Sequence, residues 1–298
     1  MELKKLLAAA GIASLLAAGS SAYAANSTSD VTQSGTGSTV SVDQSAGDNE
    51  TSTVTQSGDT SDVDVTQSGS GNVSTIVQDG TDNGATVDQS GHNNTSDIDQ
   101  TSPGGVRPER SSTSVTQSGD DNMSTVGQRG NDAMVTVMQS GSNNTSDVTD
   151  NGNRSVVMVD QIGNMNMSFI TNRAEDSSAS VSQSGDGNTG TIIQREDSPP
   201  TENYMASIIQ GGNDNTATID QDGDNLNATI DQSGNDNVAT TTQTGSFLTS
   251  IVTQSGNNNM SSVTQSGDNN MHTVTQMTDG NMSTVMQSGS GNTASVTQ

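Results

Sequence analysis

The stretch QSGDNNMHTVTQ, residues 265–276, contains the pattern that decides the fold. Counting Gln265 as position 0, Gly267 stands at +2, Asn270 at +5, Val274 at +9 and the next glutamine at +11. Residues at +5, +7, +9 and +11 alternate along the chain, so in a β-strand their side chains share one face. The Ser-Gly-Asp-Asn residues that come first are typical of tight turns. The unit therefore predicts a strand of about seven residues followed by a bend of about four.

This unit repeats along almost the whole chain. Glutamine recurs in steps of 11 residues from Gln33 to Gln298, with Asp150 and Asn172 at two of the expected positions. Three steps are longer, by a single residue near Glu50 and by loop insertions near residues 103–110 and 195–203. A disordered low-complexity chain has no reason to keep such a register, so the period indicates a repeat architecture.

A second period of 22 residues lies beneath the first. After every other glutamine the +5 residue is asparagine, at Asn49, Asn72, Asn94, Asn122, Asn144, Asn166, Asn188, Asn215, Asn237, Asn259 and Asn281. The other bends hold both loop insertions and all six arginines that follow residue 24. We therefore predict an all-β fold, a β-solenoid of stacked strand-turn-strand rungs. It has about 11 full rungs of 22 residues and two terminal half-rungs, in a single domain over residues 25–298.

The inward-facing positions form two kinds of column. Amide side chains that can bond to their copies above and below form an inward amide ladder: Gln67, Asn72, Gln89, Asn94, Gln117, Asn122, Gln139, Asn144, Gln183, Asn188, Gln232, Asn237, Gln254 and Asn259. β-Branched residues at +9 form an apolar core ladder: Val65, Ile76, Val87, Val115, Val126, Val137, Val181, Ile192, Ile219, Ile230, Val252, Val263, Val274 and Val285, with Thr241 as the interior exception. A buried valine contributes about 1.5–3 kcal/mol, whereas ordering a residue costs about 1.5 kcal/mol, so one unit alone is unstable and stability must come from stacking.

The composition excludes an ordinary globular core. Only 27% of the residues are hydrophobic, with two Phe, two Tyr and no Trp, which without a repeat would indicate disorder. The formal net charge is −26, and without residues 1–24 it becomes −27. Such a surface repels nucleic acid and anionic lipid, so we expect neither as a partner and no insertion into a membrane. Cysteine is absent, which excludes disulfides and cysteine metal sites.

The first 24 residues have the pattern of a cleaved secretory signal peptide. Lys4 and Lys5 precede an apolar run, and Ala22-Tyr23-Ala24 is a small-x-small cleavage pattern. We therefore expect cleavage between Ala24 and Ala25, and a secreted protein. The apolar run is too short to span a bilayer.

Both ends of the repeat region read as half-rungs without caps. We expect the assembly ends to contain Val31 and Gln33 at one end, and Val296 and Gln298 at the other. Uncapped sheet edges recruit further strands. The expected partner is therefore the protein itself, in a homopolymer that grows head to tail.

The unit resembles the curlin repeat of curli fibre subunits. Gln117, Gly119, Asn122, Ser124 and Gln128 stand at the positions of that repeat, and further copies in register cover the chain from residue 25 onward. The resemblance implies a functional amyloid of β-solenoid fold on the surface of a Gram-negative bacterium, with roles in cell adhesion and biofilm. It also implies export by an outer-membrane secretion apparatus and a nucleator subunit as partners.

Other function classes have weaker support in the sequence. His92 and His272 occupy different positions of the unit and no Ser/His/Asp spacing appears, so we predict no enzyme, no catalytic residues and no cofactor. Bends such as GDDN at 119–122 would stack oxygen ligands that calcium accepts. Outward threonine pairs such as Thr240 and Thr242 suit a surface such as ice, but Asp64, Met158 and Ile193 interrupt that face. A monomeric secreted acidic β-solenoid that binds calcium or ice is therefore the alternative.

Outward methionines form a further pattern at +6, namely Met123, Met167, Met260, Met271 and Met282. They could form an adhesive or oxidisable stripe, or simply be tolerated at the surface beside the bends.

Overall fold

The computed structural model describes residues 26–101, 108–195 and 203–298, and its regular structure there consists of 24 β-strands without a helix. The chain divides into two compact units, unit 1 over residues 1–150 and unit 2 over residues 151–298. The signal peptide, its cleavage site, and most of the two loop insertions (102–107 and 196–202) lie outside the described residues.

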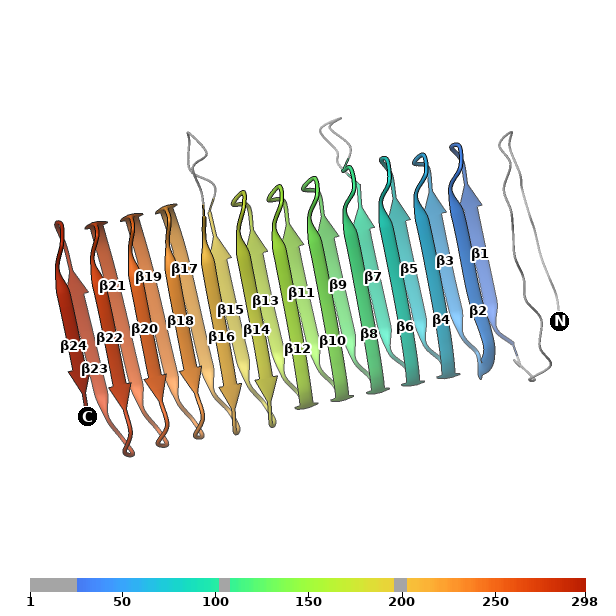
Figure 1. The fold of residues 1–298 in the computed structure, drawn as a ribbon. Coiled ribbons are helices and arrows are strands. Elements are labelled where there is room, and N and C mark those ends of the chain that lie inside the picture. Colours follow the sequence, from blue (N-terminus) through green and yellow to red (C-terminus); the bar gives the residue numbers. More distant parts are fainter. Residues whose placement is uncertain (1–25, 102–107, 196–202) are drawn as a thin grey trace. The chain divides into compact units, whose positions relative to one another are not determined.

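Unit 1 contains eleven strands in its described residues. They are β1 (Thr28–Gln33), β2 (Thr39–Asp48), β3 (Thr51–Gln56), β4 (Asp62–Ser70), β5 (Val73–Gln78), β6 (Gly84–His92), β7 (Thr95–Gln100), β8 (Ser112–Asp120), β9 (Met123–Gln128), β10 (Met134–Ser142) and β11 (Thr145–Asp150). The odd-numbered strands lie side by side in chain order and form sheet A, and the even-numbered strands form sheet B (Figure 1).

Unit 2 follows the same plan with thirteen strands in its described residues. They are β12 (Val156–Asn164), β13 (Met167–Asn172), β14 (Ser178–Ser184), β15 (Thr189–Gln194), β16 (Met205–Gly211), β17 (Thr216–Asp224), β18 (Asn227–Gln232), β19 (Val238–Ser246), β20 (Thr249–Gln254), β21 (Met260–Asp268), β22 (Met271–Gln276), β23 (Met282–Gln287) and β24 (Thr293–Thr297). Odd-numbered strands again belong to sheet A and even-numbered strands to sheet B.

Neighbouring strands in each sheet pair in parallel and in register. In unit 1, Val65 lies opposite Val87 and Gln67 opposite Gln89, so each column contains equivalent residues of successive units. Along a strand, buried and exposed residues alternate: at the start of β4, Val63, Val65 and Gln67 are buried, and the residues between them are exposed. The buried faces of the two sheets contain the core. The predicted all-β solenoid of strand-turn-strand rungs is therefore confirmed.

Two rows of bends connect the strands. We call the bends that lead from an even-numbered strand to the next odd-numbered strand Asn bends, after the asparagine they bury. We call the bends that lead from an odd-numbered to an even-numbered strand variable bends. The parts of the loop insertions that are described, at residues 108–110, 195 and 203, lie in variable bends, as the sequence predicted.

One prediction about register is wrong. The extra residue near Glu50 lies in a β-bulge of β2, between Asp43 and Ala46, and not in the bend. The register after the bulge puts Glu50 at the buried position that asparagine occupies elsewhere, and Asn49 adopts the left-handed backbone conformation before it. The 11-residue count could not find this, because it assumes that every insertion falls in a bend.

Candidate functional site

Glutamine side chains form continuous hydrogen-bonded columns in both units. In sheet B of unit 1, Gln67 Nε2 donates to Gln89 Oε1, Gln89 to Gln117 and Gln117 to Gln139, each at 2.8 Å. Nε2 of each also donates to a backbone carbonyl of the facing sheet, as Gln67 does to the Thr51 oxygen at 3.1 Å. Each amide therefore ties one rung to the next and one sheet to the other.

Unit 2 contains a column of the same kind. Gln183 donates to Gln210, Gln210 to Gln232 and Gln232 to Gln254, at 2.8–3.0 Å. All of these side chains are buried. In every link the Nε2 group points to the next residue toward the C-terminus, so the column has a direction. Sheet A contains an equivalent column, for example Gln221, Gln243, Gln265 and Gln287.

The asparagines of the Asn bends form a column with the opposite direction. The backbone N–H and Nδ2 of Asn94 donate to Asn72 Oδ1 at 2.9 and 3.1 Å, and Asn94 Nδ2 also donates to the Gly119 carbonyl oxygen at 2.7 Å. Asn122 and Asn144 repeat this, and so, in unit 2, do Asn188, Asn237 and Asn259 in their backbone N–H bonds. The side-chain oxygen that accepts therefore faces the C-terminal neighbour.

The predicted apolar residues lie between these amide columns. Val65, Ile76, Val87, Val115, Val126 and Val137 in unit 1 are at most 1% exposed. The same holds for Val181, Ile192, Ile219, Ile230, Val252, Val263 and Val274 in unit 2, whereas Val285 in the last strand of sheet A is 7% exposed. Thr241, the exception, is also buried, and its hydroxyl lies 3.2 Å from that of Ser250.

The predicted end residues lie at the edges of the sheets. Among the described residues, β1 pairs only with β3, and β24 pairs only with β22. Val31, Gln33 and Val296 are accordingly half-buried, and Gln298 is exposed. These edge strands and the columns that reach them form the candidate site.

A comparison with known families agrees with this geometry. The model of the curlin-associated repeat matches residues 58–91, 74–101, 109–141, 212–245, 234–267 and 267–298, which together cover more than half of the chain. The chain belongs to the curlin-associated repeat family. No curated protein matches the chain significantly. Curlin proteins are structural components of extracellular curli fibres, so the family assignment indicates a fibre subunit.

The curlin architecture also extends beyond the matched residues. Residues 142–211 lie outside the six matches, yet β12, β14 and β16 in that region pair in parallel and in register. The repeat is therefore structurally continuous within unit 2 even where its sequence is less typical.

The variable bends contain a feature that the sequence analysis missed. At the position that asparagine occupies in the Asn bends, unit 2 buries Tyr204, Leu226 and Leu248, which form an apolar cluster with Ala174. The Tyr204 hydroxyl is satisfied by the backbone, because it donates to the Gly223 carbonyl oxygen and accepts from the Gly223 N–H. Leu226 and Leu248 stand at +5 after Gln221 and Gln243, so the +5 count could have shown these two, whereas the insertion moves Tyr204 out of that count.

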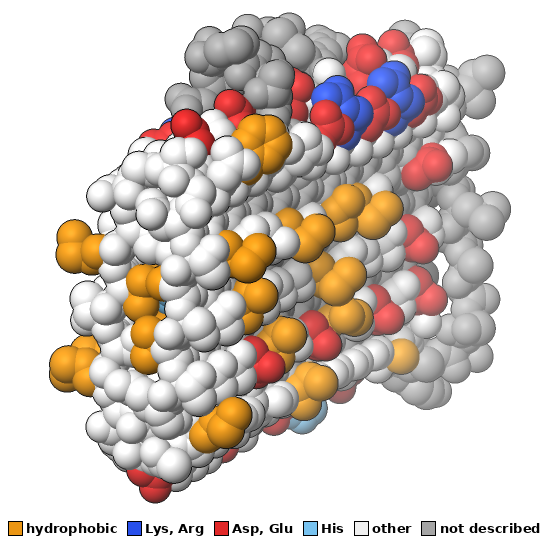
Figure 2. Space-filling view, turned by 60° about the vertical axis from the view of Figure 1, so that its left-hand side comes forward, with side chains coloured by type: hydrophobic (Ala, Val, Ile, Leu, Met, Phe, Trp, Pro, Cys, Tyr) orange, Lys and Arg blue, Asp and Glu red, His pale blue; other side chains and the backbone are white. Residues whose placement is uncertain are grey.

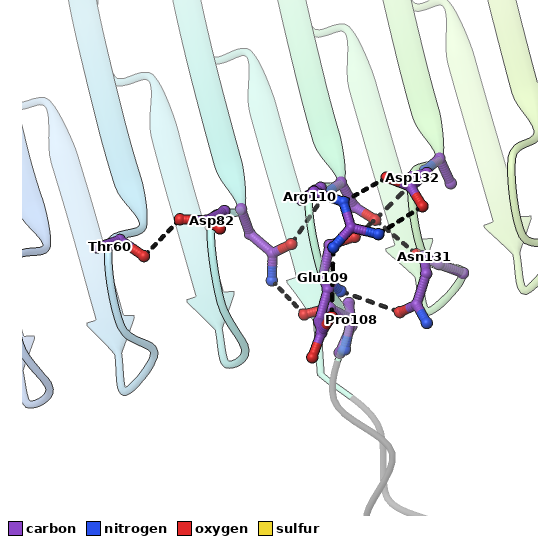
Figure 3. A network of polar contacts seen from close by, with 11 residues as sticks. Thr60, Asp82, Pro108, Glu109, Arg110, Asn131 and Asp132 are labelled. Carbon is purple, nitrogen blue, oxygen red and sulfur yellow. Dashed lines mark hydrogen bonds and ion pairs between the residues drawn. The ribbon is translucent and has the colours of Figure 1, made fainter.

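The variable bends also carry the charged contacts of this curlin chain. Arg110 binds both carboxylate oxygens of Asp132 at 2.6 and 2.8 Å, beside Glu109, whose N–H donates to Asn131 Oδ1 at 3.0 Å (Figure 3). In unit 2, Arg154 binds Asp176 in the same way. These pairs are exposed to solvent and stabilise the fold little, so their main effect is to neutralise stacked charge.

Two ionisable side chains are buried near the ends of the repeat region. Glu50 accepts hydrogen bonds from the N–H and Nδ2 of Asn72 at 2.7 and 3.3 Å, and burial raises the pKa of its carboxyl group. Burial lowers the pKa of His272 to about 4. His272 lies in the core, 3.4 Å from the Ser250 hydroxyl.

Within the described ranges, no group of three or more His, Cys, Asp or Glu side chains could hold a metal ion. No described helix is long and apolar enough to cross a membrane.

Proposed function

We propose that this curlin chain is a structural subunit of an extracellular amyloid fibre that grows head to tail, and that it is not an enzyme. In this fibre, β1 and β2 of one copy add to β23 and β24 of the next copy. The two end surfaces are complementary in hydrogen bonding, and this observation carries the proposal. The fibre would serve cell adhesion and the biofilm matrix.

The glutamine columns reach the two ends with different groups exposed. At the C-terminal end, the Nε2 groups of Gln287 and Gln298 each donate to one backbone carbonyl, at 2.9 and 3.2 Å. Elsewhere Nε2 also donates to the next glutamine, and at this end the described residues offer none. At the N-terminal end, Gln33 and Gln44 use Nε2 within the chain, and their Oε1 atoms have no partner among the described residues. A donor end therefore faces an acceptor end.

The side chains of the two ends also match in register. If β1 continues the stacking of β23, Ser29, Val31 and Gln33 lie on Ser283, Val285 and Gln287, which are identical residue types. If β2 continues the stacking of β24, its inward Val42 and Gln44 lie on the Val296 and Gln298 columns. In-register stacking of like side chains is what stabilises amide and apolar ladders in amyloid.

The energetics favour growth at such edges. The strand added gains a ladder hydrogen bond at alternate backbone groups and buries the half-exposed valines of the end rung. The two ends are different surfaces, so the contact is heterologous and does not close, which produces a filament. The charge of −27 expected after signal cleavage opposes contact, so we expect fibre formation to be faster with added salt, which screens over about 8–10 Å.

The test uses one blocked surface at a time. In the chain without residues 1–24, Val31→Asp places a carboxylate in the N-terminal end surface and Val296→Asp places one in the C-terminal end surface. Thr32→Asp and Thr297→Asp add the same charge to the outward faces of the same strands and serve as controls. Fibre growth is followed by amyloid-dye fluorescence with seeds, and small assemblies by analytical ultracentrifugation.

Head-to-tail growth makes a specific prediction for these variants. Each inward variant alone should remain monomeric, while an equimolar mixture should form a discrete dimer, because each supplies the surface that the other lacks. The outward variants should still elongate seeds. Dimers of Val31→Asp alone would indicate contact between like ends and would overturn the proposed mode of growth. Absence of fibres from the unaltered chain, even with seeds, would overturn the fibre function itself.

The location and partners form a second part of the proposal. We infer that the subunit is secreted by a Gram-negative outer-membrane secretion apparatus and that a nucleator subunit starts its assembly, as the curlin family suggests. A bacterial strain that lacks this chain should lose its surface fibres and its adhesion. Purified nucleating material that is added outside the cells should restore fibres only on cells that secrete the chain. Unchanged adhesion in that strain would contradict this role.

A further inference from the structure

Every methionine in the described part of the chain is exposed to solvent. The chain has 13 methionines, and all but Met1 lie in the described residues. Methionine is among the residue types that are most often fully buried, so this placement requires a reason. We call the twelve residues, which are 39–80% exposed, the exposed methionines: Met123, Met134, Met138, Met158, Met165, Met167, Met205, Met260, Met271, Met277, Met282 and Met286.

The core of the protein uses other apolar residues. Its buried apolar positions contain valine, isoleucine, alanine, leucine and tyrosine, and none of the described ones contains methionine. Packing of β-branched residues in register explains why methionine is absent from these positions. It does not explain why methionine stands on the outward faces, where threonine, serine and aspartate fill most positions. Figure 2 shows hydrophobic side chains that project from the surface among uncharged polar groups. The fold therefore keeps every described thioether group outside the core.

The side chains beside the exposed methionines are mostly hydrogen-bond donors. Met123 pairs in register with Thr95 in one neighbouring strand and with Thr145 in the other. Adjacent strands lie about 4.8 Å apart, so such a hydroxyl group is close enough to donate to an oxygen atom that is added to the sulfur. Met260 and Met282 pair with each other instead. The methionines that likewise pair with serine, threonine or asparagine are Met134, Met138, Met158, Met167, Met205, Met271 and Met286.

Few other side chains of this protein compete for an oxidant. The sequence contains no cysteine and no tryptophan, so a thiol or an indole ring is not available for oxidation. It contains two tyrosines, of which Tyr23 lies outside the described residues and Tyr204 is only 2% exposed. An oxidant that reaches the described surface therefore meets the thioether groups first, and neither disulfides nor links between exposed tyrosines arise there.

We propose that the exposed methionines form an oxidant-consuming layer, in which hydrogen peroxide converts them to methionine sulfoxide while the solenoid stays folded. In each step the O–O bond of the peroxide breaks and one oxygen atom is transferred to the sulfur. The sulfur is oxidised by two electrons, and the peroxide is reduced to water. Hydrogen peroxide is uncharged, so a net charge of −26 does not repel it.

The position of the sulfoxide groups explains why the fold tolerates them. Oxidation makes methionine polar and therefore disrupts a hydrophobic core that contains it. Here the new oxygen atom is bonded by water and by the neighbouring hydroxyl groups, and the net charge of the chain does not change. One chain can thus consume up to twelve peroxide molecules. Protection of other molecules at the cell surface rests on the proposed function, because it requires the chain to lie outside the cell.

The first experiment uses the monomeric chain without residues 1–24, treated with hydrogen peroxide. Mass spectrometry of the intact chain counts the added oxygen atoms, and peptide mapping locates them. Leu248→Met is the matched control, because it adds a thioether of similar volume to the buried apolar cluster. The twelve exposed methionines should react at rates within about threefold of one another, and the buried one at least about tenfold more slowly. Urea unfolding should show the same stability before and after oxidation of the unaltered chain.

The second experiment tests protection by fibres. Replacing the ten exposed methionines of the strands by threonine leaves only Met165 and Met277, which lie in bends. This variant should elongate seeds like the unaltered chain but consume about sixfold less peroxide, because two sites of twelve remain. A soluble methionine peptide mixed with each kind of fibre reports protection, and its oxidation should be slower beside unaltered fibres. A variant with leucine at the same ten positions keeps the surface apolar and should protect as poorly as the threonine variant.

Three results would overturn the inference. The first is unfolding of the chain, or dissolution of its fibres, after full oxidation. The second is oxidation of Leu248→Met at the rate of the exposed methionines, which would show that the fold does not shield its core from peroxide. The third is equal protection of the peptide by unaltered and methionine-depleted fibres. Failure of the unoxidised chain to form fibres would concern the proposed function only, since the first experiment is carried out on the monomer.

Discussion

The two rows of bends connect the same strands but bury different chemistry. The Asn bends bury asparagine in nearly every turn. The Asn94 side chain, for example, bonds to the backbone of the next turn through both its oxygen and its nitrogen, and to the asparagine side chain of the preceding turn. The variable bends bury serine, asparagine, alanine, tyrosine or leucine at the equivalent position, as at Ser61, Asn83, Ala133, Tyr204 and Leu226. The Asn bends thus use one hydrogen-bonding residue type at this position, whereas the variable bends use hydrogen-bonded side chains in some turns, such as Ser61 and Asn83, and apolar side chains in others, such as Leu226.

This difference explains where the irregularities of the sequence collect. A long insertion in an Asn bend would break a hydrogen-bonded column on both sides of the break. In a variable bend, an insertion interrupts only local contacts. Tyr204 directly follows one of the insertions, and its hydroxyl is still hydrogen-bonded, because it accepts the Gly223 N–H of a neighbouring turn. The arginines lie on the same side because their acidic partners, such as Asp132 and Asp176, lie in the next variable bend.

The largest expected effect concerns a feature that both rows share. A Cβ atom on Gly119 in an Asn bend, or on Gly245 in a variable bend, would lie 2.1 Å from the carbonyl oxygen of the next turn, and both residues have positive φ. Gly119→Ala and Gly245→Ala should each reduce the free energy of unfolding by more than about 3 kcal/mol, measured by urea unfolding of fresh monomer.

Gly289 is the control for this prediction. Its φ is +91°, but the nearest atom to an added Cβ is Asn292 Nδ2 at 3.8 Å, because no described turn follows it. Gly289→Ala should therefore cost only the backbone strain, about 1–2 kcal/mol, yet slow the addition of the next copy. Equal destabilisation by Gly289→Ala and Gly119→Ala would show that the backbone conformation, and not stacking, requires glycine.

The next effect is a direct exchange between the two rows. Asn237→Leu removes the acceptor of the Asn259 N–H and the donor to the Gly256 carbonyl oxygen, which leaves buried groups unpaired and should cost about 3–5 kcal/mol. The reverse exchange, Leu248→Asn, should cost less, about 1–3 kcal/mol. Asparagine already occupies the equivalent position of the next variable bend, where Asn270 Nδ2 donates a hydrogen bond to the Gly289 carbonyl oxygen. Urea unfolding of both variants measures the difference. A larger loss for Leu248→Asn would reverse our interpretation of the two rows.

A smaller effect comes from a buried polar residue outside both rows. His272 Nε2 has no hydrogen-bond partner among the described residues, and burial lowers the pKa of the ring to about 4. The unfolded chain binds a proton near pH 6.5, so stability is complete above that pH and falls between pH 6.5 and 4 as the unfolded state gains the proton first. The expected loss is about 3 kcal/mol, measured as the pH dependence of urea unfolding.

His272→Ser is the matched variant, because the neighbouring strand has Ser250 at the paired position. The difference in stability between the two chains should change over this pH window, while the titration of carboxylates elsewhere cancels. A constant difference between pH 7 and pH 4 would mean that the ring is solvated in the folded protein.

Most of the fold could be predicted from the sequence, because the turns of an in-register solenoid have equal lengths and therefore appear in the sequence as a fixed period. The steps of the glutamines alone predict the strands, and the alternation around Val115 or Ile230 predicts which side faces inward. The position of the bulge in β2 could not be predicted, because a count of residues cannot distinguish Ser45 from Glu50 as the extra residue.

The fillings of the variable bends were missed for a different reason. Leu226 and Leu248 each stand among polar bend residues, where an isolated apolar side chain indicates little. Only the stacking of turns brings them together with Tyr204 into a cluster. The direction of the amide columns is likewise a property of three-dimensional packing, because a glutamine does not reveal which neighbour receives its Nε2.

The smallest expected effect is a gain in stability from the core of sheet A. Ser96 is completely buried and its hydroxyl has no hydrogen-bond partner among the described residues, whereas Ala217 and Ala239 occupy the equivalent position in unit 2. Ser96→Ala removes an unsatisfied polar group at almost constant volume and should increase the free energy of unfolding by about 0.5 kcal/mol. Ser61→Ala, in a variable bend, is the control: its hydroxyl accepts the Asn83 N–H at 3.1 Å, so this variant should lose about 1 kcal/mol. A loss of stability in Ser96→Ala as large as that in Ser61→Ala would mean that the core hydroxyl is bonded in solution, and buried serines would then act as a third polar column beside those of glutamine and asparagine.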